Sequence, residues 1–207
     1  MQAGELNPNT RFRLVGNDES RKESMMFLMK AFVIALLLMA LLLTFQFNSI
    51  FAMVVIMSAV FLSSVGVLIG LIVTNSTFGI VMCGLGIISL AGIVVGNNII
   101  FIDPYKIHKE SGLSTQESLV LTAMQRIRPI LLTAGTTVIG LIPMVISMDI
   151  DFIGLNIEFG SPSSQWWKQL STAIAGGLTF ATILTLFFTP CFIMLADKVG
   201  IKMYRKL

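Results

Sequence analysis

Charged residues are scarce in this 207-residue chain: Asp, Glu, Lys and Arg make up 12% of it, whereas an ordinary soluble domain contains about 25%. Apolar residues make up 55% without counting glycine. A water-soluble globule of this size has too much surface for its volume to hide so large an apolar share. The scarcity of charge therefore excludes a soluble enzyme, a disordered protein and a nucleic-acid-binding domain.

Cysteine and histidine are also rare. Cys83 and Cys191 lie inside apolar runs far apart in the sequence, so they are interpreted as small hydrophobic residues. His108 is the only histidine, and one ligand is too few for a metal site. No segment brings a nucleophile, a base and an orienting group together. We therefore predict no catalytic residue, no metal and no cofactor.

Five long apolar runs are present instead. A bilayer core about 30 Å thick requires roughly 20 apolar residues in a helix, and the runs show none of the two-residue alternation of a membrane barrel. The sequence predicts an all-α membrane protein, a bundle of five transmembrane helices. The predicted spans are residues 25–45, 50–73, 78–102, 130–148 and 170–196.

The connections between the spans predict their arrangement. Short polar turns at 46–49 and 74–77 require neighbouring spans to be antiparallel. The longer segment 103–129 contains a capping box, Ser114 to Glu117, which opens an amphipathic helix. We expect this helix to lie on the cytoplasmic membrane surface. Residues 149–168 form an acidic loop that ends in two tryptophans typical of a membrane interface.

The distribution of positive charge favours one orientation. If the 103–129 segment and the C-terminal tail are cytoplasmic, eight Lys and Arg residues lie inside and six outside. The positive-inside rule then places the N-terminus outside and the C-terminus in the cytoplasm.

Small residues in the second and third spans predict close helix packing. Gly66 and Gly70 form one GxxxG step, and Gly92 and Gly96 form another. Glycines at this spacing allow the backbones of two helices to approach closely.

Two adjacent amides, Asn97 and Asn98, lie in the third span. They cannot both avoid lipid unless the helix is surrounded by protein. We therefore expect the third span to be the most protein-surrounded, with one amide facing the fourth span or a helix outside this chain. Hydrogen bonding between helices and a role in ion transport are both open at this point.

A polar stripe follows the fourth span. Arg126, Thr133, Thr137 and Gly140 fall at offsets of 0, 7, 11 and 14 residues, which is one helical face. The stripe lines an ion path or contacts the third span. Arg126 alternatively anchors the helix near lipid headgroups.

Three stretches of sequence carry a resemblance to a known family. They are residues 92–103 (GIVVGNNIIFID), residues 125–133 (QRIRPILLT) with 140–143 (GLIP), and residues 165–175 (QWWKQLSTAIA) with 184–190 (LTLFFTP). Together, in this order, they resemble the C-terminal half of the resistance-nodulation-division (RND) efflux permeases of the hydrophobe/amphiphile, acriflavin-resistance-like type. The resemblance covers roughly residues 10 to 200.

The resemblance implies a domain organisation. Such permeases have twelve spans in two related halves, so the five spans here correspond to the eighth to twelfth. Residues 1–24 would be the stub of a periplasmic domain, 25–200 the transmembrane bundle and 201–207 a cytoplasmic tail. The implied partners are the N-terminal half of the permease and the lipid bilayer. The full assembly would be a homotrimer with a periplasmic adaptor and an outer-membrane channel, in a bacterial inner membrane.

The resemblance also implies a mechanism, proton-coupled drug antiport, and a set of residues. Arg126 and Thr133 match positions linked to the proton pathway, and Asn97 matches an asparagine of the family beside that path. The proton-pathway candidates are therefore Asn97, Asn98, Arg126 and Thr133. The aspartate pair of the family lies in the missing half, and Gly96 stands where well-studied drug pumps have a lysine. We therefore expect the chain to be inactive alone. The alternatives are a non-transporting membrane scaffold or truncated remnant, and a protein-export accessory of the same superfamily.

Overall fold

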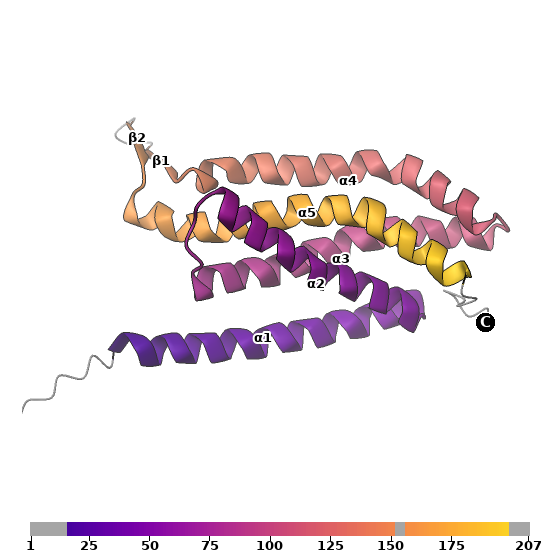
Figure 1. Cartoon of the computed structure of the whole chain (residues 1–207), viewed down its shortest axis with the longest axis horizontal. Helices are drawn as coiled ribbons and strands as arrows, with labels where there is room; N and C mark the ends of the chain where they lie inside the picture. Colours follow the sequence, from indigo (N-terminus) through magenta and orange to yellow (C-terminus); the bar gives the residue numbers. More distant parts are fainter. Residues whose placement is uncertain (1–15, 152–155, 199–207) are drawn as a thin grey trace, which may run out of the picture.

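Five long helices make up almost the whole chain (Figure 1). The computed structural model describes residues 16–151 and 156–198, so the predicted tail at 201–207 and most of the predicted periplasmic stub lie outside the described residues. All five helices are long and apolar enough to cross a membrane. The predicted all-α bundle of five helices is confirmed. Its helices are α1 (Gly16–Phe47), α2 (Ile50–Val73), α3 (Ile80–Glu110), α4 (Thr115–Val145) and α5 (Pro162–Lys198).

The predicted surface helix does not exist as a separate element in the described residues. The capping box is present: the Ser114 hydroxyl accepts a hydrogen bond from the Glu117 amide, and the Glu117 carboxylate accepts one from the Ser114 amide. The helix that it opens, however, continues through Pro129 into the fourth span. Proline removes one backbone donor and bends a helix, but a membrane helix tolerates it. The amphipathic segment is therefore the first part of α4.

The long loops expected at 103–129 and 149–168 are also mostly regular structure. α3 continues to Glu110, so only four residues separate it from α4. After α4, strands β1 (Met148–Asp151) and β2 (Asn156–Phe159) pair in an antiparallel hairpin, with Met148 opposite Phe159. The predicted acidic loop is thus a hairpin followed by the first turns of α5.

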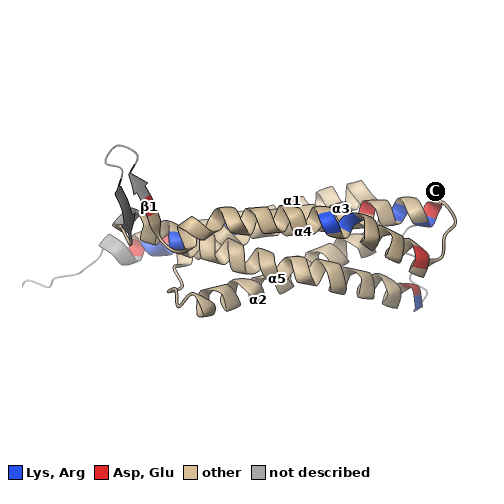
Figure 2. Cartoon of the chain, turned by 90° about the horizontal axis from the view of Figure 1, so that it is seen from above, with Lys and Arg blue, Asp and Glu red and all other residues tan. Residues whose placement is uncertain are grey.

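The two ends of the bundle are distinct. Figure 1 shows that α1 begins at the end that carries the β-hairpin, whereas α5 ends at the opposite end, beside the α3–α4 turn. In Figure 2 a long central stretch of the bundle carries no charged residue. This distribution matches a hydrocarbon layer between two polar surfaces, because an unpaired charge inside it is costly.

Helix α5 makes the most extensive helix contacts in the bundle, with α2, α3 and α4. Glycines allow its close approach to α2. A Cβ atom added to Gly176 would lie 2.6 Å from the Cα of Gly70 and 2.9 Å from the carbonyl oxygen of Gly66. No real Cβ contact is so short, so the two backbones touch here. The GxxxG step of α2 therefore packs against α5.

Helix α3 is the most protein-surrounded of the five, as predicted. Half of its most apolar stretch is buried within the chain, whereas the corresponding share is 11% for both α1 and α4. Large exposed side chains cover the outer faces of α1 and α4, among them Phe27, Leu42, Phe45, Leu132 and Ile139. These faces are suited to lipid or to further protein.

The glycine contact leads to a stability prediction. We expect Gly176→Ala to lower the free energy of unfolding by about 1–3 kcal/mol, because the new methyl group overlaps the backbone of α2. Thermal unfolding in detergent, followed by circular dichroism, measures the change. Gly92→Ala is the matched control, since a Cβ there meets no atom within 4 Å. Equal stability of the two variants would contradict the packing role of Gly176.

Candidate functional site

The amide of Asn98 lies at the contact between α3 and α5. Its side chain is fully buried, and its Nδ2 donates to the carbonyl oxygen of Val94 at 2.9 Å. The same nitrogen donates to the Thr185 hydroxyl at 3.3 Å, and the Thr189 hydroxyl donates to Asn98 Oδ1 at 2.8 Å. Both ends of the amide therefore have partners. Asn98 faces the fifth helix, so it is not the one of the two amides that was expected to face the fourth span or a helix outside this chain.

The two threonines were missed by the sequence analysis. Thr185 and Thr189 are almost completely buried and lie one helical turn apart on α5. Their spacing of four residues places them on one face of the helix, and this spacing is the signal that could have identified them. Hydrogen bonds between membrane helices contribute about 0.6 kcal/mol on average and up to about 2 kcal/mol. The Asn98 group is therefore a real but modest link between α3 and α5.

Asn97 is placed differently. It is 8% exposed, and no hydrogen bond joins it to another of the described side chains. An amide in hydrocarbon is costly unless it finds a partner. Of the two adjacent asparagines, Asn97 is the one whose hydrogen-bonding capacity is unused within the described chain.

Gly92 and Gly96 face open space. A Cβ atom at either position would meet no atom of the described residues within 4 Å, in contrast to Gly66 and Gly70. The close packing predicted for this GxxxG step therefore does not occur within the described part of the chain. Ser89, one turn before Gly92, is exposed on the same side. We call Ser89, Gly92 and Gly96 the small-residue face of α3.

The polar stripe of α4 is exposed as well. The Thr133 hydroxyl donates only into its own helix, to the carbonyl oxygens of Pro129 at 3.0 Å and Ile130 at 3.1 Å. The Thr137 hydroxyl likewise donates to the Thr133 carbonyl oxygen at 2.8 Å. Arg126 is half-buried, and its Nε is buried without a hydrogen-bond partner in the described residues. No hydrogen bond between described residues joins this stripe to Asn97.

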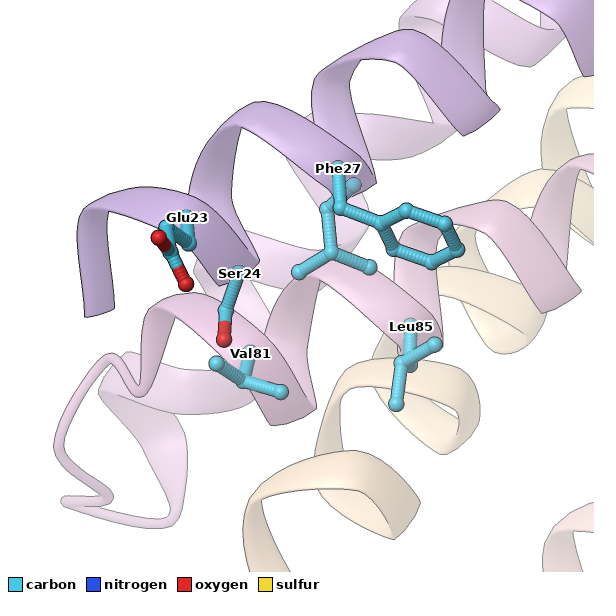
Figure 3. A pocket seen from close by; sticks show the side chains of 6 residues that line it. Glu23, Ser24, Phe27, Val81 and Leu85 are labelled. Carbon is cyan, nitrogen blue, oxygen red and sulfur yellow. The ribbon is translucent and has the colours of Figure 1, made fainter. Parts of the chain in front are cut away.

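A hollow of about 390 Å³ lies between α1 and α3 (Figure 3). Its wall is apolar except for Glu23 and Ser24, and the Ser24 hydroxyl already donates to the Ser20 carbonyl oxygen. Groups of three or more metal-ligating side chains are absent from the described residues. The buried polar side chains of the described residues are amides and hydroxyls, which do not take up a proton near neutral pH.

The chain is similar to known proteins over most of its length. The AcrB/AcrD/AcrF family model matches residues 1–197. The swarming motility protein SwrC of Bacillus subtilis (strain 168) is 36% identical over 161 residues, which is 77% of this chain and 14% of SwrC. The crystal structure of a heavy metal efflux pump matches with a TM-score of 0.72 and 29% identity, covering 88% of this chain and 17% of the pump chain. The chain thus spans less than a fifth of the length of these relatives.

Proposed function

Because the chain belongs to the AcrB/AcrD/AcrF family of RND efflux transporters, we propose that it is the membrane-embedded C-terminal half of a proton-coupled efflux antiporter. It is a transport module and not an enzyme. The chain is inactive alone, because the carboxylates that the family uses to take up protons lie in the other half. The substrate class stays open, since the family selects it in periplasmic domains.

The observation that carries this proposal is the uncovered polar surface of α3 and α4. A Cβ atom at Gly92 or Gly96 would meet no described atom within 4 Å, and Thr133, Thr137 and Gly140 of α4 are exposed. Polar and small residues within a membrane helix pack against other helices. The missing N-terminal half supplies such helices, so we propose that it covers this surface.

The residues of α4 have defined roles in this proposal. Arg126 and Thr133 lie two turns apart, about 10 Å along the axis at roughly 1.5 Å per residue. Arg126 stands toward the α3–α4 turn, and Thr133 lies deeper in the span. With the other half in place, their faces line the inner part of a hydrated proton exit.

The same proposal includes the membrane, the orientation and the assembly of the transporter. The transporter lies in the bacterial inner membrane, with the start of α1 on the periplasmic side and the end of α5 on the cytoplasmic side. It assembles as a homotrimer with a periplasmic adaptor and an outer-membrane channel. The positive-charge excess supports this orientation, and the exposed Trp166 and Trp167 support a membrane interface near the start of α5.

Co-expression tests the partner directly. We expect the chain to co-purify with a tagged N-terminal half, and Gly96→Trp to abolish co-purification because the indole fills the open small-residue face. Leu132→Trp, on the exposed apolar side of α4, is the matched control. A chain that binds the half without supporting any export would be a scaffold. If both variants bind the N-terminal half equally well, that half contacts a surface other than the small-residue face.

Thr133 separates a transporter from a scaffold. In the reunited permease, we expect Thr133→Ala to abolish drug resistance at unchanged membrane expression, because the hydroxyl lines the proton exit. Thr137→Ala, one turn further along the same face, should cost less. Growth at increasing drug concentration measures the effect. Equal resistance for Thr133→Ala and the unmodified permease would leave only a packing role.

Cysteine labelling tests the orientation. We expect a cysteine placed at Ser111, in the α3–α4 turn, to react with a membrane-impermeant maleimide only after the membrane is opened. A cysteine placed at Thr77, in the α2–α3 connection at the opposite end, should react from outside. Both positions are exposed at the ends of the bundle. The reverse pattern would invert the proposed topology.

A further inference from the structure

The hydrogen bonds of Asn98 constrain how α3 is rotated about its own axis. Oδ1 accepts from Thr189 while Nδ2 donates to Thr185, so one planar amide is held at both ends by hydroxyls one turn apart on α5. An apolar side chain at this position would still pack against α5, but its contacts would require no alignment of a donor with an acceptor. The amide group can bond both hydroxyls at only one rotation of α3, because hydrogen bonds weaken steeply when donor and acceptor are misaligned.

Among the described residues, Asn98 Oδ1 accepts a hydrogen bond from Thr189 alone, whereas Nδ2 also donates to the Val94 carbonyl oxygen of its own helix. Asn98 and Thr189 are fully buried, and Thr185 is 1% exposed. Water is absent from a bilayer core, so a broken bond between these groups is not replaced. Other hydroxyls of α5 illustrate the contrast: Thr179 and Thr182 donate to carbonyl oxygens of their own helix and join nothing to it.

The rotation of α3 decides which residues face outward. At about 100° per residue, Gly96 falls about 160° from Asn98 around the helix, and Gly92 falls about 120° from it. The structure agrees: Ser89, Gly92 and Ile100 are exposed, whereas Val94 and Ile102, on the Asn98 side, are buried. The bonds to α5 therefore keep the small-residue face directed away from α5.

We propose that Asn98 is a positioning residue, which through Thr185 and Thr189 fixes the rotation of α3 and so presents the small-residue face to the helix that covers it. The consequence for transport rests on the function proposed above, but the rotation itself does not. Asn98 takes no proton and contacts no substrate in this role. It sets the direction in which Gly92 and Gly96 face.

A distance measurement between two spin labels tests the rotation. With Cys83 and Cys191 replaced by alanine, one nitroxide is attached at Gly96→Cys and the other at Phe187→Cys, on the exposed side of α5. The label at position 96 starts nearly opposite α5, so rotation of α3 shortens the distance. We expect a narrow distribution in the parent chain, and a broader one shifted to shorter distances in Thr189→Val.

Matched variants separate the hydroxyl from the side-chain volume. Thr189→Ser keeps the hydroxyl and should preserve the parent distribution. Thr179→Val removes a hydroxyl that bonds only its own helix and should also preserve it. If Thr189→Val does not fold, Thr185→Val removes only the longer 3.3 Å bond and should shift the distances less, in the same direction. Parent-like distances in folded Thr189→Val, or in folded Thr185→Val where that variant replaces it, would overturn the proposal.

Transport in the reunited permease is the second readout. Thr189→Val should lower the maximal efflux rate about tenfold, within the range typical of residues that act through another, with KM unchanged, and Thr189→Ser should restore it. If the distance shifts but no variant supports export, the positioning role of Asn98 stands and the proposed transport function is rejected. A shifted distance with parent-like export would overturn the link between rotation and transport.

Discussion

The close approach of α2 and α5 is the contact on which the rest of the bundle depends. Lipid tails are as apolar as leucine, so apolar side chains alone give membrane helices little reason to associate. Gly66, Gly70 and Gly176 allow the two backbones to touch, and this contact seats α5 between α2, α3 and α4. Once α5 occupies the centre, its buried threonines lie beside Asn98. Packing geometry thus comes first, and the polar link between α3 and α5 follows from it.

Polar groups in the bundle divide into two sets. Asn98 is buried and its amide is bonded at both ends, so it serves the internal packing of the chain. The Thr133 stripe of α4 is exposed, and its hydroxyls donate only to carbonyl oxygens of their own helix. The second set therefore joins no two helices within the described chain and leaves a polar surface open to a neighbouring helix. This division is expected of one part of a larger helical assembly. One polar set stabilises the fold of that part, and the other contacts helices outside it.

Counting apolar runs predicted the number of helices but not their ends. The apolar run predicts that α3 ends near Asp103. The helix instead continues through Lys106 and Lys109 to Glu110. Long charged side chains extend to the membrane surface without breaking a helix. The capping box at Ser114 was predicted and confirmed, since it depends on four adjacent residues. The β-hairpin was missed because strands of four residues carry almost no periodic signal.

Length and composition alone determined that this is a bundle of five membrane helices, because a bilayer requires a fixed length of apolar helix whatever its neighbours are. The three motif-bearing stretches, in their order along the chain, indicated the family. Only the tertiary structure decided what each small or polar residue does. Two GxxxG steps look alike in the sequence, yet one touches α5 and the other faces open space. Two adjacent asparagines are both buried, yet only Asn98 bonds a second helix, because its threonine partners lie almost ninety residues further along the chain.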